Sequence, residues 1–479
     1  MKRLFLFLYV VIFSLSSFAQ IRLNKENPHY FSYKNKPVIL IASGEHYGAV
    51  VNLGFDYKKY LETLKKTGLN HTRIFLGDYF ETDGAFCIEG NTLSPKNNLI
   101  CPWQRSKTKG YALGGNKFDL DLWNDDYFVR LKDFLSVAAK NDIIVEVVLF
   151  FASYTIENSP FYYKNNINHV DKLEANQYMT LNNGNLLERQ EHYCKKIVAE
   201  INRFDNFIYN IAEEPWFANQ EYNGFSSPTT TATKKWIERV SEWIVETEKK
   251  LPKHHIISID YCNEGIEIPL EEINSYFKNI SVFNHHYDRN AMSARLNYNR
   301  INKVLSFNET GLMPPSTPQY RIQGWKYIFN GGALYNNLDF TFQVGFEDGT
   351  GKSGFSCEWY NGCDDPAVKY QLASLLKFMN SIDFIHMKPD RKVLVVNYGD
   401  EDVHPLVNTG KEYAIYFEGG KRAKLMLSIP EGKYDLKWIN PSDLRVISKK
   451  EIISDSGQLN ILGPEYKEDV LLYISKNLR

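Results

Sequence analysis

Residues 207–216 read FIYNIAEEPW, an apolar run that ends in two adjacent glutamates. A second run of the same kind, residues 304–311, reads VLSFNETG and also ends in a glutamate. Buried parallel strands are nearly continuous apolar runs, and the functional groups of α/β barrels lie where such strands end. We therefore interpret both runs as barrel strands that carry Glu213, Glu214 and Glu309 to one mouth.

Strand-like runs and amphipathic helical segments alternate on both sides of these two runs. Helices are expected at residues 57–66, 127–140, 186–202, 233–249 and 366–380. Strands are expected at residues 37–42, 72–76, 143–150, 207–212, 256–259, 281–284, 304–307 and 332–335. Eight strands with helices between them predict an α/β fold, a (β/α)8 TIM barrel rather than an open sheet.

The ends of the chain differ from this pattern and predict three regions. Residues 1–19 are expected to be a signal peptide, because Lys2 and Arg3 precede an apolar stretch and a small-residue cleavage site ends at Ala19. Residues 20–388 form the barrel domain. Short alternating runs separated by glycine and proline over residues 389–479 predict a small antiparallel β-sandwich. We therefore expect an exported protein, secreted or periplasmic.

Composition excludes several classes of protein. Among 479 residues, 56 Lys and Arg balance 57 Asp and Glu, which gives no electrostatic reason to expect a nucleic-acid partner. No apolar run after the signal peptide reaches the roughly 18 residues of a membrane span. The cysteine spacings match no zinc template, and disulfides are expected for Cys87 with Cys101 and for Cys357 with Cys363. The oligomeric state is not indicated.

Two carboxylates at one barrel mouth suit the hydrolysis of a glycosidic bond. One carboxylic acid, with a raised pKa, protonates the leaving oxygen, and the other, ionised, attacks the anomeric carbon. Taken singly, a glutamate at a strand end is as easily a salt-bridged surface residue. The 14% of aromatic residues fits sugar binding through ring stacking, or simply a large core.

Four motifs together resemble the clan A glycoside hydrolases, the superfamily that includes the family 5 cellulases and mannanases. They are the two glutamate motifs, GLNHTRI at 68–74 and HHY at 285–287. The resemblance implies that Glu214 is the acid/base, that Glu309 is the nucleophile and that Arg73 and Tyr287 bind Glu309. It also implies a supporting role for His285, and retaining cleavage of a β-linked plant or algal glycan without a cofactor or metal.

One departure from the clan pattern leaves alternatives open. The clan has asparagine directly before the acid/base, where this chain has Glu213. Either the substrate differs there, or Glu213 is itself the acid and Glu214 points away. The substitution also suits a non-catalytic carbohydrate-binding protein on a degenerate barrel. A third reading, adhesion, rests on the likeness of the C-terminal region to a small β domain described as collagen-binding.

Further side chains near the strand ends are candidates for contact with a carbohydrate substrate. Aromatic rings there can stack on sugar faces, although a histidine beside a strand is as easily a hydrogen-bonded core group. The candidates are His46, Tyr47, Trp216, Tyr335, Asn336 and Trp359.

Overall fold

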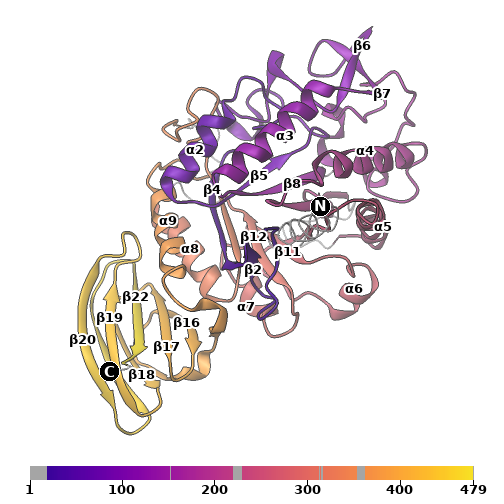
Figure 1. The fold of residues 1–479 in the computed structure, drawn as a ribbon. Helices are drawn as coiled ribbons and strands as arrows, with labels where there is room; N and C mark the ends of the chain where they lie inside the picture. Colours follow the sequence, from indigo (N-terminus) through magenta and orange to yellow (C-terminus); the bar gives the residue numbers. More distant parts are fainter. Residues whose placement is uncertain are drawn as a thin grey trace, which may run out of the picture.

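A parallel barrel forms the centre of the molecule (Figure 1). The computed structural model describes residues 19–151, 153–218, 229–311, 313, 317–352 and 362–477, so most of the expected signal peptide lies outside the described residues. The barrel strands are β4 (Leu40–Gly44), β5 (His71–Phe75), β8 (Ile144–Phe150), β9 (Phe207–Ala212), β10 (Ile257–Asn263), β11 (Val282–His286), β12 (Val304–Glu309) and β13 (Leu334–Leu338). Neighbouring strands pair in parallel in the order β4-β13-β12-β11-β10-β9-β8-β5, which confirms the predicted TIM barrel.

The two ends of this strand order meet at a seam bridged by Asn70. The backbone N–H of Asn70 donates to the carbonyl of Ile41 at 3.2 Å. Its side chain accepts from the N–H of Ile41 at 2.9 Å and donates to the carbonyl of Ile39 at 2.8 Å. One side chain thus satisfies two backbone groups at the start of β4, those of Ile39 and Ile41, that a regular strand pair would otherwise satisfy.

Helices surround the barrel, and the expected ones are present with small shifts at their ends. They are α2 (Tyr57–Thr67), α3 (Asp125–Lys140), α4 (Leu186–Ile201), α5 (Thr231–Glu248), α6 (Leu270–Ser275), α7 (Ser293–Asn297), α8 (Thr317–Phe329) and α9 (Val368–Met379). The start of α2 is fixed by Asp56, whose side chain accepts from two backbone N–H groups, and its end by Gly68 with φ 93°.

The expected first strand, 37–42, is divided in the structure. Its first part, β3 (Lys36–Val38), pairs antiparallel with β2 (Phe31–Tyr33), which also pairs with β1 (Arg22–Leu23). Its second part belongs to barrel strand β4. After β5, the strands β6 (Trp103–Lys109) and β7 (Asn116–Trp123) form a hairpin that projects from the barrel (Figure 1).

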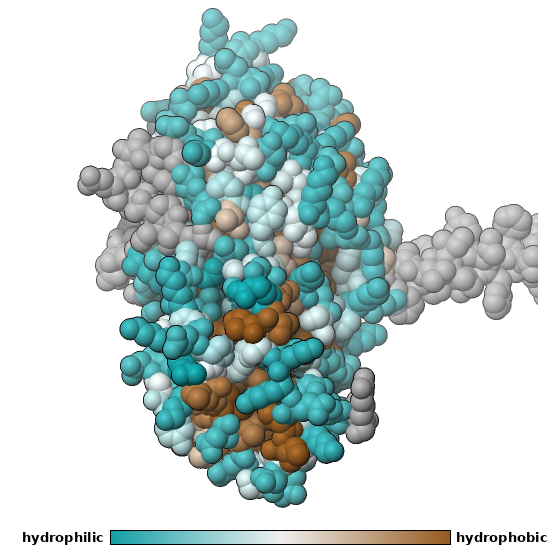
Figure 2. All heavy atoms as spheres, turned by 90° about the vertical axis from the view of Figure 1, so that its left-hand side faces the viewer, coloured by the Kyte–Doolittle hydropathy of each residue, from teal (hydrophilic) through white to brown (hydrophobic). Residues whose placement is uncertain are grey.

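The C-terminal region contains the predicted antiparallel sheets. One sheet has the order β14-β16-β17-β22-β19-β20 and the other β15-β18-β21. The strands are β14 (Lys388–Pro389), β15 (Leu394–Asn397), β16 (Asp402–Asn408), β17 (Glu412–Glu418), β18 (Arg422–Ser428), β19 (Gly432–Ile439), β20 (Val446–Ser454), β21 (Gln458–Glu465) and β22 (Asp469–Lys476). Between the sheets lies a core of aliphatic and aromatic side chains. Exposed apolar side chains of this domain include Val395, Val446, Ile453 and Leu462. Figure 2 shows that the surface of the molecule is hydrophobic in places.

The sandwich packs directly on helix α8 of the barrel (Figure 1). Arg321 donates two hydrogen bonds to Asp469, at 3.0 and 2.7 Å. The ring of Trp325 stacks on that of Tyr416 with centroids 5.7 Å apart. A buried bidentate ion pair beside stacked rings fixes the orientation of the two domains.

The predicted disulfide pairs do not form. Cys87 is disulfide-bonded, but Cys101 and Cys363 are free, buried thiols. Cys357 lies outside the described residues. Closeness in sequence was a poor guide, because Cys101 is a free thiol although it lies near Cys87 in the chain. Within the described residues, no helix combines the length and apolarity needed to cross a bilayer.

Candidate active site

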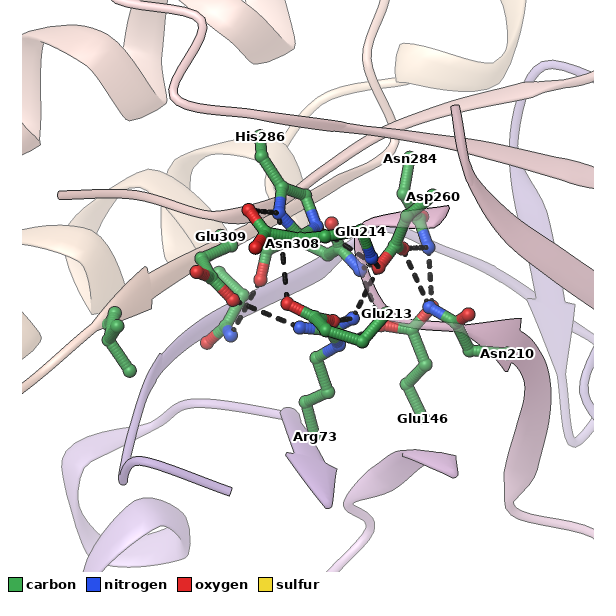
Figure 3. Close-up of polar contacts among 12 residues, drawn as sticks. Arg73, Glu146, Asn210, Glu213, Glu214, Asp260, Asn284, His286, Asn308 and Glu309 are labelled. Carbon is green, nitrogen blue, oxygen red and sulfur yellow. Dashed lines mark hydrogen bonds and ion pairs between the residues drawn. The ribbon is translucent and has the colours of Figure 1, made fainter. Parts of the chain in front are cut away.

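Strands β9 and β12 bring three glutamates together at the barrel mouth (Figure 3). Glu213 and Glu214 follow β9, and Glu309 is the last residue of β12. Four atoms lie within 4.8 Å of one another: one carboxylate oxygen from each of the three glutamates and a ring nitrogen of His286. Each of the three glutamates is at most 5% exposed. The two motifs therefore form one buried acidic cluster.

Arg73, on β5, is the cation at the centre of this cluster. Its Nη1 donates to Glu309 Oε2 at 3.1 Å, and its Nη2 donates to Asp260 Oδ2 at 2.7 Å and to Glu213. Its Nε lies 3.3 Å from Glu146 Oε2. The expected bond between Arg73 and Glu309 is present, and the same guanidinium also contacts three further carboxylates.

Glu309 is held in the ionised state. The hydroxyl of Tyr287 donates to Glu309 Oε1 at 2.5 Å, as the resemblance implied. Burial alone would raise the pKa of Glu309, but the charges of His286 and Arg73 and the bond from Tyr287 together lower it. The carboxylate is thus anionic near neutral pH.

Glu214 has the opposite electrostatic character. Burial raises its pKa to about 7, against the lowering effect of His286, whose Nδ1 lies 3.3 Å from Glu214 Oε1. The backbone of Glu214 has φ 42°, a conformation that residues other than glycine rarely adopt. Its N–H donates to Asp260 at 3.4 Å. A strained turn therefore aims the carboxyl of Glu214 at the cluster.

Glu213 is bound to Arg73 and also faces the cluster. Its Oε1 lies 3.9 Å from His286 Nδ1. Burial raises the pKa of Glu213 well above its usual value, although the charge of Arg73 opposes this. Glu213 and Glu309 thus share one guanidinium, and Glu214 does not point away as the alternative hypothesis required.

The histidine at this site is His286, not the expected His285. Side chains alternate along β11, and His286 faces inward, with Nε2 3.2 Å from Asp260 Oδ2. The charges of Asp260 and Glu213 raise the pKa of His286 well above its usual value, although burial opposes this. His285 faces outward beside the ring of Tyr261, and burial lowers its pKa to about 4. The sequence motif was one residue out of register with the strand.

An irregularity in β12 turns two consecutive residues toward the barrel interior. The pairing with β11 shifts where His286 aligns with Glu309, so that Asn308 is an extra residue. Asn308 Nδ2 donates to Glu146 at 3.0 Å and to Asp260 at 3.1 Å, while Glu309 reaches Arg73. Regular alternation would have pointed one of the two away from the interior.

Below the glutamates lies a polar layer that the sequence reasoning missed (Figure 3). Two carboxylates, Asp260 on β10 and Glu146 on β8, accept hydrogen bonds from the amides of Asn210, Asn284 and Asn308. Asp260 directly follows the expected strand 256–259, so the rule that selected Glu214 and Glu309 would have found it. Glu146 is the one charged residue of the apolar run 143–150.

Two predicted substrate-contact residues on β13, Tyr335 and Asn336, bind other parts of the protein instead. The hydroxyl of Tyr335 donates to the carbonyl of Tyr320 at 3.1 Å and to Gln323 at 3.0 Å, so this ring faces α8 outside the barrel. The prediction for Tyr335 is wrong, because strand alternation turns it from the mouth. Asn336 faces the interior, but it is fully buried and its amide donates to the carbonyl of Asn308 at 3.0 Å.

His46 and Tyr47 lie beside the cluster as expected. His46 Nε2 lies 3.1 Å from a carboxylate oxygen of Glu81. The ring of Tyr47 lies 4.8 Å from the guanidinium of Arg73 and stacks on Phe75, with centroids 5.0 Å apart. Both side chains are nearly fully buried, so they form the wall of the site around Arg73.

Trp216 also supports the site from within. It is fully buried and its ring meets that of His286 edge to face, with centroids 5.2 Å apart. A sugar-stacking face on Trp216 is therefore not open. Trp359 lies outside the described residues.

Among the residues that the structure describes, two groups of side chains have the ligand types of a metal site, but both already contain a cation. Arg73 contacts two members of the cluster of Glu213, Glu214, His286 and Glu309. The second group, Asp402, His404 and Glu418, surrounds the ammonium of Lys326, which lies 3.4 Å from Asp402 and also contacts Glu418. Each arrangement is that of an ion-pair network, and we assign no metal to either.

Comparison with known proteins relates the fold to solved glycoside hydrolase structures. No family model and no curated protein matches the sequence. A structure named "Glycoside hydrolase" superposes with a TM-score of 0.61 at 13% identity, over 97% of this chain and 98% of the other. A glycoside hydrolase family 5 structure from Bacteroides vulgatus gives a TM-score of 0.61 at 13% identity, over 95% and 93% of the two chains. The barrel fold expected from the resemblance is thus shared with solved glycoside hydrolase structures.

Proposed function

We propose that the protein is a retaining glycoside hydrolase in which Glu309 is the nucleophile and Glu214 the acid/base. The observation that carries this proposal is the opposite tuning of two adjacent buried carboxyls. Glu309 has a lowered pKa, and the pKa of Glu214 is raised to about 7. When the pKa values of two neighbouring carboxyls differ in this way, the group with the lowered pKa is the base or nucleophile and the group with the raised pKa is the acid.

The short separation of the two carboxyls supports retention of configuration. Oxygens of Glu214 and Glu309 lie within 4.8 Å of each other. Retaining enzymes hold their carboxyls about 5–5.5 Å apart, whereas inverting enzymes leave about 6.5–9.5 Å to admit a water.

The proposed reaction has two displacements. Glu309 attacks the anomeric carbon while Glu214 donates its proton to the departing glycosidic oxygen, giving a glycosyl-enzyme. Glu214, now ionised, removes a proton from water, which attacks the same carbon and releases Glu309. Arg73 and Tyr287 keep Glu309 anionic and aligned before the first step.

Glu213 is the competing candidate for the acid, and its contact with Arg73 argues against it. An oxygen of Glu213 is fixed on the guanidinium, so its carboxyl is not free to reach a leaving group. Glu214 instead contacts His286, which can donate to it at each stage of the reaction. We assign the acid to Glu214, and to Glu213 the role of holding Arg73 in place.

The deciding experiment compares wild type with Glu309→Gln, Glu214→Gln and Glu213→Gln on β-linked polysaccharides and aryl glycosides. We expect Glu309→Gln to abolish release of sugar. Glu214→Gln should retain activity only on aryl glycosides with acidic leaving groups, which need no protonation. If Glu213→Gln shows this leaving-group dependence instead, Glu213 is the acid. NMR of the first-formed anomer tests retention.

The carbohydrate and the compartment belong to the same proposal. A β-linked plant or algal glycan is the substrate class that the motifs favour, and the N-terminal pattern supports export. Binding of a glycan that raises the melting temperature of all four proteins, with no cleavage by any, would instead identify a carbohydrate-binding protein. Mass spectrometry of the mature N-terminus in a secreting host tests the expected cleavage after Ala19.

A further inference from the structure

We propose that Asp260 is a positioning residue that couples the two proposed catalytic carboxyls through the cations that touch them. Asp260 Oδ2 contacts Arg73 and His286, and these in turn contact Glu309 and Glu214. The catalytic meaning of this coupling rests on the proposed function. The coupling itself is a property of the resting protein and can be measured there.

Asp260 receives donors from four other barrel strands. Arg73 of β5 donates at 2.7 Å, and the Asn210 amide of β9 at 2.7 Å. The amides of Asn284 on β11 and Asn308 on β12 donate at 2.9 and 3.1 Å. Because Asp260 is 1% exposed, this carboxylate has nearly all its hydrogen-bonding capacity filled by fixed protein donors. A side chain so held is a rigid anchor for the groups around it.

The charge of His286 depends on this anchor. A buried imidazole is disfavoured in its charged form, so anions must hold the proton on the ring. Asp260 is the largest of those anionic influences on the pKa of His286. The same two cations, Arg73 and His286, hold the pKa of Asp260 well below its usual value against the effect of burial.

His286 transmits the effect of Asp260 to Glu214. An imidazolium lowers the pKa of Glu214, both as a hydrogen-bond donor and as a charge, and these influences exceed the direct repulsion from Asp260. Removing the Asp260 charge should therefore neutralise His286 and raise the pKa of Glu214. Among the described residues, the charged and titratable groups that border His286 and Glu214 are Glu213, Asp260, Tyr287 and Glu309, and Arg73 contacts three of these four.

Glu146 provides a matched control within the same layer. It accepts from the same three asparagine amides and lies 3.3 Å from Arg73 Nε. Among the described residues, no contact joins Glu146 to His286 or Glu214. Asp260→Asn and Glu146→Gln therefore disturb the same network, but only the first removes the partner of His286.

The first measurement is the protonation of His286 in full-length protein labelled with ¹⁵N-histidine, with the signal assigned through His286→Gln. We expect an imidazolium at pH 7 in wild type and in Glu146→Gln, and a neutral ring in Asp260→Asn. This readout needs no substrate. A protonated His286 in Asp260→Asn, or a neutral one in both variants, would overturn the proposal.

The second measurement is the pH dependence of kcat/KM on whichever substrate wild type cleaves. We expect Asp260→Asn to lower kcat/KM about 100-fold through misplacement of the carboxyls, and to move the alkaline limb upward by about half a pH unit or more. Glu146→Gln should leave that limb in place. In a His286→Gln background, Asp260→Asn should no longer move the limb upward, because the upward shift passes through His286 and only the direct repulsion from Asp260 is then lost.

These two measurements distinguish a failure of the proposed function from a failure of the proposed role of Asp260. If no substrate is cleaved while His286 titrates as expected, the proposed function fails and the coupling stands. If cleavage occurs but the alkaline limb of Asp260→Asn matches that of Glu146→Gln, Asp260 is only a structural residue.

Discussion

The barrel mouth and the C-terminal sandwich bury opposite kinds of side chain. The sandwich buries a core of aliphatic and aromatic side chains, such as Leu472 and Trp438, between its sheets. The barrel mouth buries carboxyl groups in a layer whose cations, among the described residues, are Arg73 and His286 (Figure 3). Buried charges are expensive even when paired, whereas apolar burial is favourable.

This contrast indicates what each region is selected for. An apolar core contributes stability and tolerates no loss of volume. A crowded set of carboxylates costs stability, and it persists where perturbed pKa values are needed for function. Substitutions should therefore separate the two regions: those in the mouth should change activity more than stability, and those in the sandwich the reverse.

The largest effect is expected from Glu309→Gln. Loss of the proposed nucleophile should lower kcat by at least about 10⁴-fold. The melting temperature should fall only modestly, because the lowered pKa of Glu309 means that Arg73, His286 and Tyr287 stabilise its anion in the folded protein. Paired activity and calorimetric measurements test this, and a large drop in melting temperature would show that Glu309 is a structural ion-pair residue.

The next effect, in the other region, is expected from Trp438→Ala. The Trp438 ring is buried against Phe417 and closely approaches Gly463, so truncation leaves a cavity. We expect a loss of about 3–5 kcal/mol in the free energy of unfolding of the sandwich. Turnover by the folded protein at low temperature should be unchanged, and denaturant unfolding monitored beside activity checks this. Trp438→Phe is the milder control.

A smaller effect, dependent on pH, is expected from Glu214→Gln. The folded pKa of Glu214, about 7, is above the unfolded value of about 4.5, so wild type loses stability as pH rises from 4.5 to 7. Glutamine removes that loss, which is at most about 3 kcal/mol. The variant should match wild type below pH 4.5 and become more stable by pH 7. Thermal melts across this window test the sign, and an opposite trend would refute the raised pKa.

The fold and the principal site residues were accessible from sequence because their signals are local. Apolar runs and amphipathic periods located the eight strands, and the strand-end rule found Glu214 and Glu309. Arg73 and Tyr287 followed from the resemblance. Each of these residues is located by the sequence pattern of its own strand, so it can be predicted from the sequence without knowing how the strands pair.

The rest depended on how strands align with one another. The extra residue Asn308 turns Glu309 inward, and strand alternation selects His286 over His285 and turns Tyr335 toward α8. The register of a β-pair is a property of two strands, and a one-residue shift exchanges the two faces. The predicted disulfide pairing also failed, since Cys101 is free while Cys87 is bonded.

The finest test of the contrast removes one tyrosine hydroxyl from each region. Tyr287 donates to Glu309 at 2.5 Å, and the buried Tyr434 of the sandwich donates to the carbonyl of Pro430 at 2.9 Å. A hydrogen bond to a charged group contributes about 1.5–3 kcal/mol and a neutral one about 0.5–1.5 kcal/mol.

Tyr287→Phe should therefore lower kcat/KM about 10- to 100-fold, since Glu309 loses a donor that lowers its pKa, and should cost no more than about 3 kcal/mol of stability. Tyr434→Phe should leave kcat/KM unchanged and cost about 1 kcal/mol of stability. Kinetics and chemical denaturation of both variants give four numbers. If both substitutions reduce stability alike and neither changes kcat/KM, the bond from Tyr287 serves the fold of the mouth rather than the ionisation of Glu309.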